Sequence, residues 1–217
     1  MRFATEAWPF VLPFVLLSAF FTFAGRGGWA VAFAALAVLV LLFFRDPVRR
    51  FDGDPLAVLA PADGRVLSVE VLEDPEIGPG RFRRVVTFLS VFNVHTQRAP
   101  VAGEVLVSRL TRGEKRAAFA KDIDDVNERH LSVIVTPSGD RIGVRQMVGL
   151  VARRIVCYLK PGQSVGRGAP LGLIKFGSRV DLWVPESYSI QVSPGQTVRS
   201  GLTVMALPPA AVTEERR

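Results

Sequence analysis

A glycine–serine pair interrupts a strand-like run near the end of the chain. In "IKFGSRVDLWVP", apolar residues such as Ile174 and Val180 alternate as in a β-strand, but Gly177 and Ser178 break the pattern. Glycine inside a strand weakens it and usually marks a bulge or a close approach of the backbone. A Gly-Ser pair alone carries no weight, because composition yields about one in a chain of this size. The break therefore needs a reason from the rest of the sequence.

The side chains best suited to proton transfer are the two histidines, His95 and His130. His95 lies in "FLSVFNVHTQRAP", where a strand-like run meets a proline-limited turn, a place where loops present functional groups. His130, in "NERHLSVIV", is expected to be a partly exposed residue at a strand edge. Asp63, in "PADGRV", is explained by the turn chemistry of Asp-Gly alone. None of these signals stands by itself.

The elements that must position these residues are short strands. After Asp46-Pro47 the chain consists of β-branched runs broken by glycine and proline, which is typical of strands joined by turns. One stretch, 115–126, is expected to be helix or loop. The sequence predicts a mainly β (α+β) fold, an antiparallel barrel or sandwich.

Two pairs of segments resemble each other. "PGQSVGRGAPLGLI" from Pro161 matches "PGQTVRSGLTVMAL" from Pro194, and "PADGRV" at Pro61 resembles "PVAGEV" at Pro100. Repeated hairpins suit a barrel or sandwich whose related halves wrap around each other, although Pro-Gly turns also recur in β proteins without symmetry. Lipoyl- and biotin-carrier domains are built from similar hairpins, so a membrane-anchored carrier or adaptor module is an alternative function.

The N-terminus holds two uncharged apolar runs, 8–25 and 27–44, with only Arg26 between them. Each run is about long enough to cross a hydrocarbon core of ~30 Å as a helix. A cleavable signal peptide is an alternative, but a second uncharged run would not normally follow it at once. A re-entrant hairpin that does not cross is another alternative, which Pro9 and Pro13 would suit.

Basic residues set the expected orientation of this hairpin. Arg45, Arg49 and Arg50 follow the second run directly, whereas the turn offers Arg26 alone. Because positive residues favour the cytoplasmic side, the rest of the chain is expected to face the cytosol from the cell (inner) membrane. The expected organisation is a membrane-anchoring hairpin at 1–50 and a cytosolic domain at 51–217.

The charge and cysteine content agree with this location. The formal net charge of +7 suits a domain held at an anionic leaflet, and no stripe of aromatic residues among basic ones suggests nucleic-acid binding. The single cysteine, Cys157, is compatible with a reducing compartment. No metal site is expected.

Five blocks in series carry a family resemblance: "PADG", "FLSVFNVHTQRAPVAG", "NERH", "VGLVARRIV" and "KFGSRVDLWVP". Their order and spacing, from about Phe51 to Leu207, resemble those of the short form of phosphatidylserine decarboxylase. The resemblance implies a self-processing enzyme that converts phosphatidylserine to phosphatidylethanolamine and carbon dioxide through a Schiff base. A decarboxylase of another amine or of a related serine lipid is the remaining alternative within the same chemistry.

The resemblance also gives the break at Gly177 and Ser178 a purpose. It implies that the Ser178 hydroxyl attacks the Gly177 carbonyl, that the resulting ester is lost by β-elimination, and that a covalent pyruvoyl cofactor remains at position 178. Glycine suits the attack because it has no Cβ and tolerates a strained backbone. The products, 1–177 and 178–217, are expected to stay together as a heterodimer, with further oligomerisation left open.

Catalytic roles follow for three residues. Ser178 needs activation because a neutral hydroxyl is a weak nucleophile, and His95 is the expected base. By the logic of a serine-protease triad, Asp63 would orient His95, so the three side chains are expected in a hydrogen-bonded row. His95 is also a candidate proton donor in the decarboxylation itself.

Arginines supply candidate ligands for the lipid headgroup. Longer bacterial members of the family carry a His-x-x-His pair where this chain has His95 and Arg98. Arg98 cannot act as a base, but it could hold the lipid phosphate or carboxylate. Arg153 and Arg154 point to opposite faces of a strand, so at most one of them would reach the phosphate.

Overall fold

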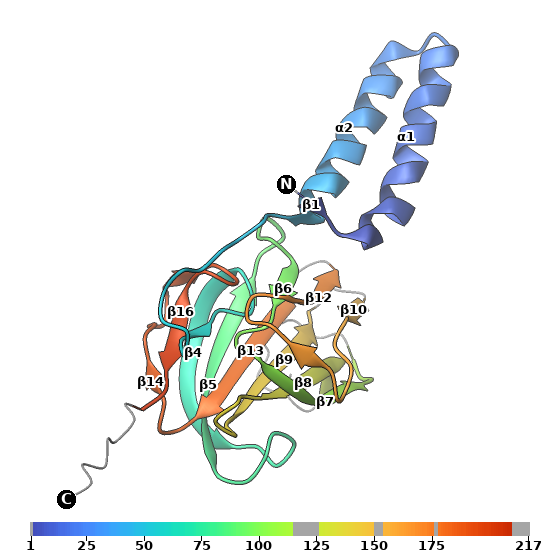
Figure 1. Ribbon diagram of the computed structural model, residues 1–217. Coiled ribbons are helices and arrows are strands. Elements are labelled where there is room, and N and C mark those ends of the chain that lie inside the picture. Colours follow the sequence, from blue (N-terminus) through green and yellow to red (C-terminus); the bar gives the residue numbers. More distant parts are fainter. Residues whose placement is uncertain (1, 115–125, 150–153, 176–177, 210–217) are drawn as a thin grey trace, which may run out of the picture.

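The structure is a computed structural model that describes residues 2–114, 126–149, 154–175 and 178–209 (Figure 1). A helical hairpin projects from one end of a β body. The body is mainly strands, so the predicted fold class is confirmed. Residues 115–125, most of the stretch expected to be helix or loop, lie outside the described residues.

The two apolar runs form helices, as predicted. A 3₁₀ turn (Thr5–Ala7) leads into α1 (Trp8–Phe23), and α2 (Gly27–Phe43) returns beside it. The Ser18 hydroxyl donates to the Ala30 carbonyl across the hairpin at 2.8 Å. The turn and α1 together form a 19-residue apolar segment long enough to anchor the chain in a membrane, whereas α2 has 17 residues.

The strands form antiparallel sheets. A short pair, β1 and β2, closes the base of the hairpin. The main sheet has eight strands in the order β11-β7-β8-β9-β13-β5-β4-β15 and curls around the core, and two three-stranded sheets have the orders β10-β12-β6 and β14-β16-β3 (Figure 1). The strand bounds are β1 (Arg2–Phe3), β2 (Arg45–Asp46), β3 (Val58–Leu59), β4 (Gly64–Glu73), β5 (Arg81–Leu89), β6 (Thr96–Arg98), β7 (Gly103–Thr111), β8 (Arg129–Val135), β9 (Arg141–Val148), β10 (Arg154–Cys157), β11 (Ser164–Val165), β12 (Pro170–Lys175), β13 (Ser178–Pro185), β14 (Ser189–Ile190), β15 (Thr197–Val198) and β16 (Val204–Leu207).

The strand order repeats itself about the middle of the main sheet. The central pair of the main sheet is β9 and β13. On the β9 side the order outward is β8, β7, β11, and it corresponds to β5, β4, β15 on the β13 side. The small sheet β10-β12-β6 corresponds in the same way to β14-β16-β3. One half therefore consists of β3–β5 and β13–β16, and the other half, β6–β12, is inserted into it. The predicted internal repeat is confirmed.

The repeated sequence motifs occupy equivalent places in the two halves. Gly64 and Gly103, the glycines of the Pro-x-x-Gly-x-Val motifs, begin β4 and β7. A Cβ on Gly64 would lie 2.2 Å from the Phe88 carbonyl oxygen, and one on Gly103 would lie 2.1 Å from that of Val135. Glycine is required because the neighbouring strand passes too close for any side chain.

Apolar residues from alternate positions of the main sheet fill the space inside its curve. The core includes Val144 and Val148 of β9 and Val180 and Leu182 of β13, all essentially buried. Residues between them, such as Trp183, point to the opposite face and pack in a separate cluster. This alternation decides which side chains can reach the interior near Ser178.

Candidate active site

The Gly177–Ser178 break lies between two strands rather than within one. β12 ends at Lys175 and β13 begins at Ser178, and these strands belong to different sheets. The single interrupted strand expected from alternation is wrong, because the chain crosses here from one sheet to the other. The backbone of Ser178 pairs with Leu89 of β5 and Val148 of β9. Gly177 itself lies outside the described residues.

The chain also passes between these two sheets at a second place, from β5 in the main sheet to β6 in the sheet of β12. After Leu89 at the end of β5, residues 90–95 lead to Thr96 at the start of β6. Because β5 pairs with β13 and β6 pairs with β12, this crossing joins the partners of the two strands that flank the Gly-Ser pair. His95 is its last residue, and its neighbour Thr96 pairs with Leu173 of β12. Pairing therefore brings His95 beside the last residues of β12, which precede the Gly-Ser pair.

His95 is buried in a setting that keeps it neutral. The side chain packs on the ring of Phe43 at the end of α2, with centroids 4.1 Å apart. Nδ1 lies 2.9 Å from the Asn93 carbonyl oxygen; since this oxygen only accepts, Nδ1 donates and the lone pair stays on Nε2. Burial is the main cause that lowers the pKa of His95 from 6.5 to about 4, with a smaller contribution from Arg45, while the Asn93 carbonyl and the charge of Asp63 oppose it. No described residue hydrogen-bonds Nε2, which is therefore available as a base.

Asp63 accepts hydrogen bonds from other residues than His95, the partner expected from the sequence. Both of its carboxylate oxygens accept from the Arg49 guanidinium, one of them at 2.8 Å, and Oδ1 also accepts from the Ser200 amide at 2.8 Å. Among the described contacts, Asp63 has no hydrogen bond to His95, whose ring is oriented by Asn93 instead. The influence of Asp63 on His95 is through its charge, which favours the protonated ring.

Arg98 holds the body to the chain that leaves the hairpin. Its guanidinium pairs with the Asp46 carboxylate and donates to the carbonyls of Pro47 and Gly168 at 3.0 and 2.9 Å. The residue is 8% exposed. Arg98 is therefore buried, and its guanidinium binds the segment that follows the helical hairpin.

Two cations gather instead where the body meets the hairpin. Arg154 of β10 is exposed and pairs across the strands with Lys175, two residues before Gly177. The Lys175 ammonium lies 4.7 Å from the ring centroid of Phe10 in α1. Burial lowers the pKa of Lys175, and the charge of Arg154 lowers it further. Arg153 lies outside the described residues.

The residue after Ser178 is also fixed. Arg179 is buried on the outer face of the main sheet, where Nε and Nη2 each donate to one oxygen of Asp181 at 2.7 Å. Such a bidentate pair holds both side chains in one geometry. The start of β13 is therefore anchored on the face opposite to the core.

His130 is a core residue, contrary to the expectation of a partly exposed one. It is 7% exposed, and its ring nitrogens lie 3.3 Å from the Ser108 hydroxyl and 3.5 Å from that of Ser132. Burial lowers the pKa of His130 to about 4. It belongs to a polar cluster within the curve of the sheet.

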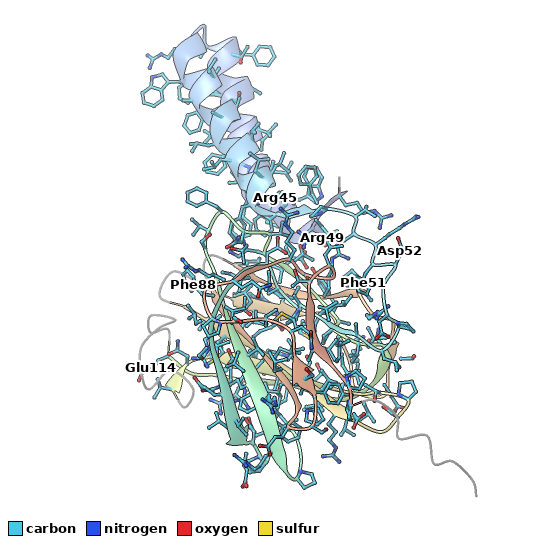
Figure 2. All side chains as sticks on the ribbon, turned by 90° about the vertical axis from the view of Figure 1, so that its left-hand side faces the viewer. Arg45, Arg49, Phe51, Asp52, Phe88 and Glu114 are labelled. Carbon is cyan, nitrogen blue, oxygen red and sulfur yellow. The ribbon has the colours of Figure 1, made fainter. Side chains whose placement is uncertain are left out.

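Sequence reasoning missed the residues that support this site from the hairpin side. Arg45 donates to the carbonyls of Leu42, at the end of α2, and Phe92, in the crossing before His95. Arg45 and Arg49 both lie where the hairpin meets the β body (Figure 2). Their position directly after an apolar helix indicates only the orientation of the hairpin, and nothing local in the sequence pairs them with residues far along the chain.

Comparisons with known proteins agree with this geometry. The model of the family "Phosphatidylserine decarboxylase" matches residues 36–206. A phosphatidylserine decarboxylase proenzyme of Symbiobacterium thermophilum is 42% identical over 204 residues, covering 93% of this chain and 94% of the relative. Proteins of the same name from Burkholderia ambifaria and Burkholderia multivorans are 40% and 39% identical over 203 residues, covering 94% of both chains. The chain belongs to the phosphatidylserine decarboxylase family.

Proposed function

We propose that this chain is a proenzyme that cuts itself between Gly177 and Ser178 and then converts phosphatidylserine to phosphatidylethanolamine and carbon dioxide. The observation that carries the proposal is the position of His95. A neutral imidazole with a free Nε2 lies beside the end of β12, the strand that precedes the Gly-Ser pair, in a family whose relatives compared above are named proenzymes. The carrier alternative loses its support, because Lys175 ends a strand just before this pair and does not stand at a hairpin tip.

The first step is the attack of the Ser178 hydroxyl on the Gly177 carbonyl carbon. His95 Nε2 takes the hydroxyl proton, and collapse of the adduct turns the peptide bond into an ester. Removal of the Ser178 α-proton then expels the carboxylate of Gly177. The remaining dehydroalanine loses ammonia on hydrolysis, which leaves a pyruvoyl group at position 178. A base with a lowered pKa suits the first proton transfer because it is unprotonated throughout the neutral range.

The residues around position 178 fit a pyruvoyl group. Its carbonyl would supply an electron-accepting centre that binds the substrate amine and stabilises the charge left by carbon dioxide. The chain holds that position through the ladder from Ser178 to Leu89 and Val148 and through the Arg179–Asp181 pair. His95 Nε2 faces a buried setting that excludes water from the reacting atoms.

The cleaved products would remain one particle. The segment from 178 to 217 contributes β13, between β9 and β5, and also β15 and β16, which pair with β4 and β3. Strands of the long product therefore flank those of the short one in two sheets. This interleaving supports a heterodimer of 1–177 and 178–217.

The lipid phosphate would bind to Arg154 and Lys175 in this proposal. These two cations lie at the end of the body from which the hairpin projects, and Lys175 precedes the break by two residues. Arg98 is a weaker candidate because it is buried and both of its terminal nitrogens already bind Asp46, Pro47 and Gly168.

We also propose that residues 1–50 anchor the enzyme in the cell membrane and that 51–217 work at its cytosolic face. Phe92 and Val91, in the crossing before His95, are 82% and 47% exposed, and Arg45 ties Phe92 to the end of α2. This apolar tip would enter the lipid surface beside the anchor. Substrate headgroups would then meet the site without leaving the membrane.

The test is carbon dioxide release from vesicles that contain phosphatidylserine labelled in its carboxyl group. The purified protein should release label from these vesicles and produce phosphatidylethanolamine, and it should release none from free serine. A protein that is fully cleaved but releases no label from phosphatidylserine would contradict the proposed substrate.

A further inference from the structure

Four of the buried polar atoms without partners lie on β5, β9, β6 and the segment just before β6. Among the described residues, the hydroxyl of Thr87, Nε2 of His95, Nε2 of Gln97 and Oε1 of Gln146 have no hydrogen-bond partner. Each of these residues is at most 2% exposed. Buried polar groups in native proteins are nearly always paired, so a group of unpaired ones calls for a ligand or a chemical role.

Strand pairing places two of these residues beside Val180, two positions along β13 from Ser178. Gln146 and Val148 point inward from β9, and Val148 is the residue opposite Ser178. Thr87 of β5 and Gln146 of β9 lie on either side of Val180, two residues along β13 from Ser178. Both side chains share the inner face with Val180.

The other two residues come from the crossing and from β6. Gln97 lies in β6, two residues after His95. The Gln146 amide donates to Gln97 Oε1 at 3.0 Å, which joins the β9 wall to the β6 wall. Gln97 therefore meets Gln146 of β9, and Val148, two residues further along β9, pairs with Ser178.

The Gln97–Gln146 pair always leaves one amide NH₂ group and one amide carbonyl without a partner. One amide–amide bond uses one NH₂ group and one carbonyl, which leaves a free NH₂ on one residue and a free carbonyl on the other. If both amides are turned by 180°, Gln97 becomes the donor and Gln146 the acceptor. One NH₂ group and one carbonyl still remain without a partner. The site thus always offers a neutral donor and a neutral acceptor.

We propose that Gln97, Gln146 and Thr87 form the subsite for the carboxylate of the serine headgroup, an inference that rests on the proposed function. The free amide NH₂ donates to one carboxylate oxygen and the Thr87 hydroxyl to the other, and the free amide carbonyl accepts from the headgroup nitrogen. Neutral donors orient the carboxylate without the strong stabilisation of an ion pair. This suits a group whose negative charge must leave it in the transition state.

The test uses the double variant Gln97→Leu/Gln146→Leu and the isosteric variant Thr87→Val. Both remove unpaired buried groups while conserving volume, so neither is expected to lower the midpoint of thermal unfolding. Both should be cleaved like the parent protein. The double variant should lose at least tenfold in kcat/KM for phosphatidylserine, and Thr87→Val several-fold.

A headgroup probe gives a readout besides activity. Glycerophosphoserine and glycerophosphoethanolamine differ only in the carboxylate, and their effect on the thermal midpoint is compared on the cleaved enzyme. The parent protein should be stabilised more by glycerophosphoserine, and the double variant should lose this difference. Ser132→Ala is the control: it removes a buried hydroxyl that has partners, so it should lower the midpoint but leave kcat/KM unchanged.

Three results would overturn the inference. The first is a double variant with kcat/KM within twofold of the parent. The second is a double variant whose activity falls only in proportion to its folded fraction. The third is a double variant that is no longer cleaved, because the amides would then act in processing. A parent protein that is cleaved but inactive on phosphatidylserine would instead overturn the proposed function, and this inference with it.

Discussion

At the scale of single residues, the environment of His95 decides which role the ring can take. Its Nδ1 is committed to the Asn93 carbonyl, and burial disfavours the protonated form. Before cleavage the ring is therefore suited to accept a proton from Ser178. To donate a proton during decarboxylation, His95 would first have to receive one. The variant His95→Ala in already cleaved enzyme tests this role, and unchanged turnover would rule it out.

Replacing Ser178 by alanine should abolish both cleavage and decarboxylation. Without a hydroxyl, nothing can attack the Gly177 carbonyl or be eliminated. A denaturing gel should show one chain, and labelled phosphatidylserine should release no carbon dioxide. Ser193→Ala, an exposed serine in a turn, is the matched control and should behave like the parent.

The rate of self-cleavage should change little with pH between about 5.5 and 8. The pKa of His95 is lowered to about 4, so the base is unprotonated over this whole range. An unperturbed histidine would instead slow cleavage about tenfold at one pH unit below its pKa of 6.5. The rate is measured on freshly synthesised proenzyme by quantifying the two products. A fall that follows a pKa near 6.5 would contradict the assigned environment of His95.

The sequence located the candidate residues but not their partners. Ser178 and His95 could be named because their local motifs are specific as a set. The Asp63–His95 hydrogen bond was wrongly expected because Asp63 meets Arg49 and the Ser200 amide, which approach it through tertiary structure. Local sequence does not reveal such competitors.

At the scale of elements, the two halves of the fold meet at the site. The crossings from β5 to β6 and from β12 to β13 are the two places where the chain passes between the halves. The candidate residues His95 and Ser178 therefore lie just before β6 and at the start of β13, one strand from each half. Turn motifs made the repeated hairpins predictable, because glycine and proline act locally. The pairing of β4 with β15 and of β7 with β11 joins distant segments, so it could not be predicted.

Gly64→Ala and Gly103→Ala should each destabilise the fold by about 1–3 kcal/mol, because the new methyl group must displace the backbone of the neighbouring strand. The two equivalent positions should respond alike in chemical unfolding. Gly166→Ala, where a Cβ meets nothing within 4 Å, is the control and should have little effect. Unequal effects at Gly64 and Gly103 would argue against equivalent packing in the halves.

At the scale of the whole molecule, two buried histidines make stability depend on pH. In the unfolded chain His95 and His130 take up protons near their ordinary pKa of 6.5, whereas in the folded chain they do so only near 4. Between these values the unfolded state binds more protons, so the free energy of unfolding falls as the pH is lowered.

The expected slope is up to about 1.4 kcal/mol per pH unit for each histidine. Chemical unfolding in detergent from pH 7 to 4.5 measures it. His130→Gln should reduce the slope by about half while leaving the direction unchanged. A free energy of unfolding that is constant over this range would contradict the burial of both rings.

The apolar tip before His95 should lie in the lipid surface. An environment-sensitive fluorophore on Phe92→Cys, in a Cys157→Ala background, should be quenched by nitroxide lipids when the protein is in vesicles. The same label on Leu72→Cys is the control; Leu72 is an exposed apolar residue of β4 and should remain unquenched. Equal quenching at the two positions would contradict the proposed orientation.

The central claim is that the peptide bond between Gly177 and Ser178 breaks without another protein. Intact-mass measurement of the purified chain tests it most directly. Self-cleavage should give a long product that ends at Gly177 and a short one that begins at position 178 and is lighter by one ammonia than a chain with serine there. An undivided chain of 217 residues that still decarboxylates phosphatidylserine would contradict it.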